Sequence, residues 1–540
     1  MANNIVTVNV TQTVAPTPSL LQQSGAMISQ GATSLTAGSY SFLTQYSDLT
    51  ALLLPGQTLS SLAWANGTVT ATVSSESVTA GTYNSTTGQV TLTLGTALTG
   101  LTAGASVLVA GLAGTGTFAD AEGTFTAETG TTSTSVVYTI QTGLTMTITS
   151  GGTVAFALPA IGDTFITTIA SAQPVAYNGT YLATVTTASE FTYALTADPG
   201  TETNPGTFTP SNQGELVAMA TTFFAQGAIQ GAYVLELGPN EPTASVAALS
   251  TFITDNPGVF YRYLIPRNWD ANAAFLAFLP DYESTTALTY FDVTTTAANE
   301  TSYTNLMKCV TAYVEAPGIP LTEFDAAFGF YNRLSQNPSS TNRATPFAFA
   351  EGYGVTPYPT KGNSALFSTL KTDNVNWIGT GAQGGISTAI LYWGVNKDGR
   401  DGLYWYSVDW AQINASLNLA NAIINGSNNP LNPLYYNQQG INTLQDVAAQ
   451  TMQSAVTFGL AQGSVIKTAL TGPALSQAIA NGTFSNQIVV NAVPFIPYLQ
   501  ASPSDYKTGT YNGLSVVYIP SNGFKAILFN LNVTDFAAAA

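Results

Sequence analysis

The sequence contains no histidine, and its 540 residues include a single cysteine. Without histidine, Ser-His-Asp and Cys-His catalysis and histidine-ligated metal sites are excluded. Cys309 cannot form a disulfide within the chain, and no Cys cluster with zinc-binding spacing is present. It lies in the apolar run CVTAYV, where a small buried side chain is a better interpretation than a catalytic thiol. The sequence therefore predicts no metal site.

Charged residues are scarce, at 8% of the chain, compared with about 25% in an average protein. No Lys or Arg occurs before Arg262, whereas 13 acidic residues do, so most of the net charge of −17 lies in that half. Nucleic-acid binding needs Lys and Arg to displace counterions from phosphates, so no direct contact with nucleic acid is predicted. Hydrophobic residues make up 45% of the chain, which is enough to form large cores and excludes a disordered protein.

Long apolar runs are also absent. The first thirty residues have neither a basic start nor a long apolar segment, which predicts a protein made without a secretory leader. No run approaches the roughly 18 apolar residues of a membrane span. We therefore expect a soluble protein without membrane insertion.

The length predicts several domains, at about 150 residues each. Between residues 60 and 210, Thr, Gly, Ser and Val dominate, and runs such as QVTLTL (89–94) alternate apolar and polar residues, as β-strands do. This region is predicted to be all-β and sandwich-like. Its internal similarity, at a period of about 56 residues, divides it into related modules at about 101–157 and 158–210.

Beyond this region, helical and strand patterns alternate, which is typical of a sheet covered by helices. GELVAMATTFFAQG (214–227) is a predicted helix, and AYVLELG (232–238) is a buried strand. The fold class is therefore α+β and multidomain. The predicted parts are an N-terminal arm and linker at 1–25, an α/β core at 26–59 and 211–510 that can be divided near 340–400, the inserted β region at 60–210, and a C-terminal hairpin and linking strand at 511–540.

Two stronger helix patterns lie in the C-terminal third. Apolar residues at spacings of three and four define one face of each helix, and both faces are predicted to pack in the core. The first stripe, within residues 408–425, is Trp410, Ile413, Leu417, Ala420 and Ile424, and the second is Leu444, Ala448, Met452, Ala455 and Gly459.

Both ends of the chain have strand patterns. Residues 5–10 (IVTVNV) are rich in valine, and residues 525–536 (KAILFNLNVTDF) alternate apolar and polar residues, as a half-buried strand does. Terminal segments are poorly ordered unless they are tied down, so these strands need partners. The residues predicted to face a partner sheet are Ile5, Val6, Val8, Val10, Ile527, Phe529, Leu531 and Val533.

Two glycine-containing motifs permit a chemical interpretation. Residues 379–384 match GxGxxG, but a dinucleotide site needs these glycines to open a helix after a strand, and a strand pattern follows them here. Residues 397–402 (KDGRDG) lack the alternate oxygen ligands of a calcium loop. We interpret both motifs as turns, and the sequence predicts no cofactor.

Paired carboxylates could serve a glycosidase, which needs two acids flanking a sugar. Glu323 with Asp325, or Asp281 with Glu283, are available, but no spacing selects either pair. No catalytic residue is therefore predicted, and the protein is not expected to be an enzyme.

With these segments in order, the chain resembles contractile tail sheath proteins of bacteriophages. The resemblance rests on residues 218–227 (AMATTFFAQG) followed by 232–238 (AYVLELG), and on 402–405 (GLYW) through Asp409-Trp410 to the helix ending near Gly459. The order of the parts along the chain also supports the resemblance: an N-terminal arm, a large domain inserted early and a terminal strand. It covers roughly residues 1–55 and 211–540. The inserted β region is larger than the family pattern requires.

The resemblance implies a subunit that stacks as hexameric rings in a helical cylinder around an inner tail tube, and contracts to drive the tube through the host envelope. Terminal arms in that family add strands to a small sheet of neighbouring subunits. It implies further partners in the baseplate and tail terminator proteins, and a place in the virion tail after assembly in the host cytoplasm. The alternative hypothesis is a phage-borne or surface β-rich adhesin or decoration protein that binds glycans.

Overall fold

The computed structural model describes residues 20–526, except 211, 228–229, 239, 304–306, 360–362 and 381–388. The chain divides into two compact units, and the protein has the predicted α+β multidomain class. Unit 1 comprises Met1–Gln22, Gln336–Ala348 and Arg400–Ala540, and unit 2 comprises Gln23–Ser335 and Phe349–Gly399.

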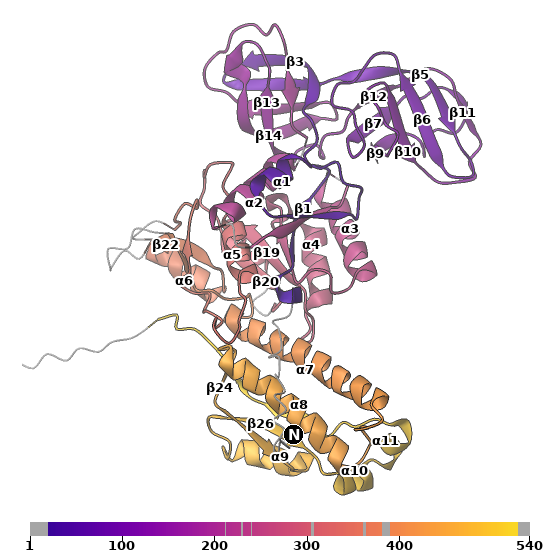
Figure 1. Ribbon diagram of the computed structural model, residues 1–540. Coiled ribbons are helices and arrows are strands. Elements are labelled where there is room, and N and C mark those ends of the chain that lie inside the picture. Colours follow the sequence, from indigo (N-terminus) through magenta and orange to yellow (C-terminus); the bar gives the residue numbers. More distant parts are fainter. Residues whose placement is uncertain are drawn as a thin grey trace, which may run out of the picture. The chain divides into compact units, whose positions relative to one another are not determined.

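Unit 2 is built on a six-stranded sheet of order β2-β17-β1-β18-β19-β20 (Figure 1). Five strands are parallel, and β2 joins β17 antiparallel at one edge. The parallel strands are buried along almost their whole length, as expected for a sheet covered on both faces. The strands are β1 (Gly25–Ser29), β2 (Tyr40–Leu43), β17 (Ala232–Glu236), β18 (Arg262–Ile265), β19 (Tyr290–Thr295) and β20 (Val310–Val314).

Helices cover this sheet because its strands present apolar residues to both sides. Met27 and Leu264 pack with α2 and α5, whereas Ile28 and Ile265 pack with α3 and α4. The predicted helix at 214–227 and strand at 232–238 are confirmed as α2 and β17. The helices are α1 (Tyr46–Thr50), α2 (Gln213–Ala225), α3 (Pro242–Asp255), α4 (Ala273–Phe278) and α5 (Asp325–Leu334).

A smaller sheet of order β21-β23-β22 completes unit 2, together with α6 (Ser364–Thr372). Trp377 of β22 stacks on Tyr392 of β23 with ring centroids 5.6 Å apart. The strands are β21 (Glu351–Gly352), β22 (Trp377–Thr380) and β23 (Ala389–Tyr392).

The inserted region is all-β, as predicted; the strands within 101–157 and those within 158–210 belong to different sheets, but each group is joined by two strands from before residue 101. Two early strands join four late ones in a closed barrel of order β13-β14-β15-β4-β3-β16. Closure leaves a barrel without free edges, which local alternation in the sequence cannot reveal. The barrel strands are β3 (Gln57–Ala65), β4 (Thr68–Val73), β13 (Thr164–Ala170), β14 (Gly179–Thr187), β15 (Glu190–Ala194) and β16 (Thr207–Phe208).

The segment between the two parts of the barrel forms a six-stranded sheet of order β10-β6-β5-β12-β7-β9 and a β11-β8 pair. Its buried residues and those of the barrel belong to one apolar cluster. The strands are β5 (Ser75–Tyr83), β6 (Gln89–Leu94), β7 (Ser106–Ala110), β8 (Gly114–Gly116), β9 (Gly123–Thr126), β10 (Ser135–Thr139), β11 (Met146–Ile148) and β12 (Thr153–Phe156).

Unit 1 contains two long helices, α7 (Gly402–Asn428) and α8 (Gln438–Thr457), which pack against each other. Both helices were predicted, and their existence is confirmed. Two small sheets accompany them, of order β25-β26-β27 and β24-β28. The remaining elements are β24 (Ala461–Gln462), β25 (Ser464–Thr468), α9 (Gly472–Ala480), β26 (Gln487–Ala492), α10 (Phe495–Ala501), α11 (Pro503–Thr508), β27 (Leu514–Val517) and β28 (Ile519–Pro520).

The predicted core stripe of α7 is only half buried. Trp410 is completely buried, but Leu417 is 54% exposed and Ile424 is 57% exposed. The apolar cluster of unit 1 reaches α7 only as far as Ala411. The prediction is therefore wrong for the C-terminal half of the helix, where the described chain leaves the stripe mostly exposed.

Candidate assembly site

The eight predicted linking residues lie outside the described residues. The structure therefore does not test their pairing. They are Ile5, Val6, Val8, Val10, Ile527, Phe529, Leu531 and Val533.

The small sheet β25-β26-β27 is the candidate receiving site for such a strand. Its central strand, β26, runs parallel to β25 and antiparallel to β27. Ile488 and Val490 of β26 pack in one apolar cluster with Ala448 and Met452 of α8. These two positions of the predicted α8 stripe are thus core residues, and α8 gives the sheet a rigid backing.

Polar side chains fix the ends of the sheet. Gln445 of α8 donates from Nε2 to the carbonyl oxygens of Thr468 and Val490, over 2.7 and 2.8 Å. Asn491 is buried, accepts from Leu470 N at 2.8 Å and donates to Leu470 O at 3.0 Å. Because buried amides are costly when unpaired, these bonds stabilise the sheet near the C-terminal ends of β25 and β26.

Both outer strands of this sheet pair on one side only within the described part of the chain. An outer strand presents a row of backbone N–H and C=O groups that can pair with another chain, and proteins usually protect it with charges or prolines. Here β27 has no charged residue, and β25 has one, Lys467. Lys467 forms an exposed ion pair with Asp446, which contributes little stability. The two edges are chemically suited to receive a strand.

The sequence prediction of a hairpin at 511–540 is only partly described. β27 pairs with β26, and β28 pairs with β24. Residues 521–526 follow without regular structure, and 527–540 lie outside the described residues. Within the described residues, no strand after β28 pairs with β27, so the predicted hairpin is not tested.

The carboxylate pair Glu323 and Asp325 is part of a larger cluster in unit 2. Arg267 donates from Nε to Glu315 at 2.6 Å and from a terminal nitrogen to Glu215 at 3.1 Å. Asp325 is completely buried beside Glu315 and Glu323, and burial is the main cause that raises its pKa well above the ordinary value. A glycosidase needs carboxylates that reach a sugar, and Asp325 is closed to any substrate.

The second pair has a structural role as well. Glu283 accepts from Lys308 N at 2.6 Å and from Cys309 N at 3.2 Å, so it caps the start of β20. Asp281 is exposed on the surface. Cys309 is buried, and burial raises the pKa of its thiol, which disfavours the reactive thiolate.

The turn interpretation holds for residues 397–400 of the second glycine-containing motif, whereas the described residues of the first, 379–380, lie in a strand. Asp401 precedes α7 and accepts from Leu403 N at 2.8 Å as its N-cap. Lys397 is buried and donates to the carbonyl oxygens of Glu300 and Asp373. Gly379 lies in β22, but 381–384 lie outside the described residues. Within the described ranges, no group of three metal-ligating side chains lies together.

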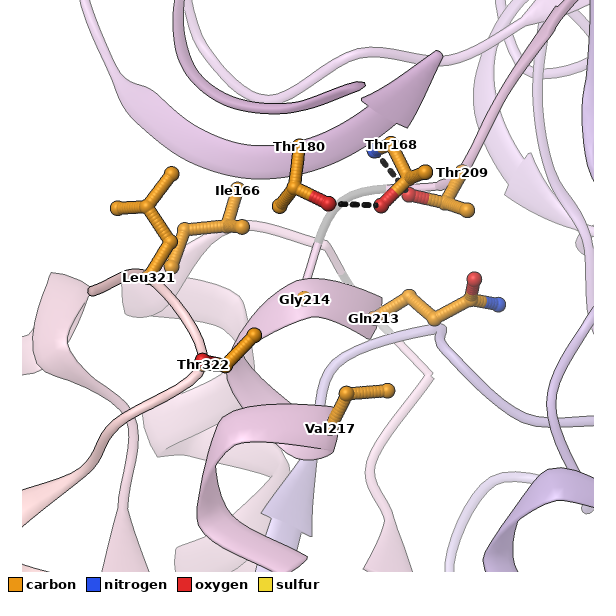
Figure 2. A pocket seen from close by; sticks show the side chains of 9 residues that line it. All are labelled: Ile166, Thr168, Thr180, Thr209, Gln213, Gly214, Val217, Leu321 and Thr322. Carbon is orange, nitrogen blue, oxygen red and sulfur yellow. Dashed lines mark hydrogen bonds between the residues drawn. The ribbon is translucent and has the colours of Figure 1, made fainter. Parts of the chain in front are cut away.

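A pocket lies between the barrel and α2 (Figure 2). The Thr168 and Thr180 hydroxyls are 2.9 Å apart, and Thr209 Oγ1 accepts from Thr168 N at 2.9 Å. None of its lining residues is ionisable, so the pocket offers no acid, base or charged ligand group for chemistry. The lining residues are Ile166, Thr168, Thr180, Thr209, Gln213, Gly214, Val217, Leu321 and Thr322.

No family model matches the chain, and no curated protein matches its sequence. Among solved structures, the chain is similar to the sheath tail protein Lin1278 from Listeria innocua. The similarity covers 83% of this chain and 86% of that one, with 9% sequence identity and a TM-score of 0.34. Among the described helices, none has the length and apolar character to cross a bilayer.

Proposed function

We propose that this protein is a structural subunit of a phage contractile tail sheath. It polymerises as stacked hexameric rings in a helical cylinder around the inner tail tube, and contraction drives the tube through the host envelope. It meets the baseplate and tail terminator proteins at the cylinder ends, resides in the virion tail, and makes no direct contact with nucleic acid.

The observation that carries this proposal is the sheet β25-β26-β27, with both outer edges open within the described chain. A strand from a neighbouring copy can extend such a sheet through backbone hydrogen bonds. Residues 525–536 supply a suitable strand, because Ile527, Phe529, Leu531 and Val533 alternate with polar residues. Head-to-tail contacts of this kind generate a helical polymer when their rotation does not close.

Deletion of residues 525–540 tests the proposal. The shortened chain is expected to fold, because these residues lie outside the described cores, but to form no tubes. Negative-stain electron microscopy of the full-length and shortened chains measures tube formation, and circular dichroism measures folding.

A matched control separates strand addition from a general effect of mutation. Phe529→Asp with Leu531→Asp should abolish tubes, because it places charge on the apolar face of the strand. Asn530→Asp with Asn532→Asp adds the same charge on the opposite face and should preserve them. Tubes formed by the shortened chain would refute the linking role of this segment.

A further inference from the structure

The net charge of the protein is confined to one unit. Unit 2 contains 24 acidic and 7 basic residues, which account for the whole charge of −17. Unit 1 contains five acidic and five basic residues and is electroneutral. A contact through unit 2 places like charges next to each other, whereas a contact through unit 1 does not and leaves only the weaker, longer-range repulsion between the two acidic units.

Unit 1 presents an apolar face along the second half of α7, which we name the α7 face and define as Leu417, Ala420 and Ile424. These residues follow one another at helical spacing and continue the stripe that begins at the buried Trp410. Leu417 and Ile424 are 54% and 57% exposed. Leu431, just beyond the helix, is 94% exposed. The described residues of unit 1 therefore leave these apolar side chains mostly uncovered.

The chain on both sides of the α7 face in sequence contains no charge. No Asp, Glu, Lys or Arg occurs between Asp409 and Asp446, a stretch that covers most of α7, the following loop and the start of α8. Large exposed apolar patches mark interaction sites on soluble proteins. Depletion of charged residues is characteristic of the buried centre of protein–protein interfaces.

We infer that the α7 face binds a second copy of this chain. A nucleic acid or an anionic lipid surface would require basic residues, which this stretch lacks. A second copy can bring its own electroneutral unit 1 to the contact, so association buries apolar surface without juxtaposing like charges. This inference rests on the proposed function in one respect: copies of the chain must contact each other. The contact through the α7 face is distinct from the strand linkage through residues 525–536.

The test compares two double variants of the full-length chain. Leu417→Gln with Ile424→Gln removes the apolar face and keeps helix propensity, since Gln is a good helix former. The control, Leu182→Gln with Ile161→Gln, changes residues of similar exposure, 54% and 68%, in unit 2. Self-association is measured by sedimentation velocity over a concentration series, and folding by circular dichroism.

The α7 variant should keep the wild-type spectrum and melting temperature but associate at least about tenfold more weakly, as expected for loss of interface anchors. The control should associate like the wild type. Raising the salt concentration should strengthen wild-type association, because salt screens repulsion between the acidic units and does not weaken apolar contacts.

An α7 variant that associates like the wild type would overturn the inference, and so would a wild-type chain that stays monomeric. Binding to phosphatidylcholine vesicles is measured in parallel. An α7 variant that loses vesicle binding but keeps self-association would also overturn the inference. Wild-type association without tubes that is still sensitive to the α7 variant would refute the sheath proposal alone. Tubes formed equally by the wild type and the α7 variant would refute the α7 contact alone.

Discussion

Asp325 shows how one buried side chain can couple unit 2 to pH. Neither of its carboxylate oxygens receives a hydrogen bond within the described chain. It faces Glu315 and Glu323, while the positive charge of Arg267 opposes their effect only in part. Burial is also the main cause that raises the pKa of Glu315. Both carboxyl groups therefore hold their protons more tightly in the folded state than in the unfolded chain.

This raised pKa predicts that unit 2 loses stability as pH rises. The folded state binds more protons than the unfolded state once pH exceeds the ordinary Asp pKa, about 3.9. Stability therefore falls with rising pH until the folded-state pKa is passed. Asp325→Asn should flatten the dependence of melting temperature on pH between 5 and 8. It should also stabilise the protein at pH 8, by on the order of 1 kcal/mol, because the amide can donate to the neighbouring carboxylates.

Asp281→Asn provides the matched control, because it makes the same substitution at an exposed position of the same unit. Its pH profile should follow the wild type. Thermal unfolding followed by circular dichroism at several pH values measures both variants. A pH profile of Asp325→Asn parallel to that of the wild type would contradict the role assigned to this side chain.

At the scale of the element, α7 has two halves with different roles. Trp410 is buried and meets the Phe458 ring edge-on, with centroids 5.6 Å apart. Ile424, on the same stripe, is mostly exposed. The first half is a core helix, and the second half is available to a partner.

Alanine substitutions should separate these halves. Trp410→Ala should destabilise unit 1 by about 3–5 kcal/mol, because it leaves a large cavity. Ile424→Ala should change the stability of the dilute protein by no more than about 0.5 kcal/mol, as is usual at surface positions. Urea denaturation at low protein concentration measures both effects. Comparable destabilisation by the two variants would show that the second half of α7 is also packed in the isolated subunit.

At the scale of the whole molecule, the two units differ in charge and have separate cores. The chain crosses from one unit to the other at 22–23, 335–336, 348–349 and 399–400. Unit 2 carries the acidic self-repulsion, and unit 1 is neutral. Screening by salt should therefore stabilise unit 2 and leave unit 1 nearly unchanged.

Differential scanning calorimetry should accordingly show two transitions. Increasing NaCl from 20 to about 200 mM, which shortens the screening length severalfold, should raise the melting temperature of one transition only. Trp410→Ala should lower the other transition, which assigns it to unit 1. A single transition, or equal salt shifts of two, would contradict the independence of the units.

Local sequence patterns determined much of the architecture. Alternation of apolar and polar residues predicted an all-β region at 60–210, and helical spacing predicted α2, α7 and α8, because these periodicities follow from backbone geometry. The absence of histidine excluded histidine-based catalysis and histidine-ligated metals without any structure, whereas the lack of contact with nucleic acid, expected from the low charge content, stays a prediction. Pairing of the terminal strands at Ile5–Val10 and beyond Lys525 stays a prediction.

Only the tertiary structure decided how these elements combine. Barrel closure brought 57–73 together with 164–208, a long-range pairing that alternation leaves unspecified. The spacing of Leu417 and Ile424 defined a helix face, but whether a face is buried depends on what covers it. The cluster around Asp325 exists because Arg267, Glu315 and Glu323 converge from separate segments. The periodicity of apolar residues and the local composition depend on residues that are close in sequence. Burial and the clustering of charged side chains depend on residues that are far apart in sequence, which only the tertiary structure brings together.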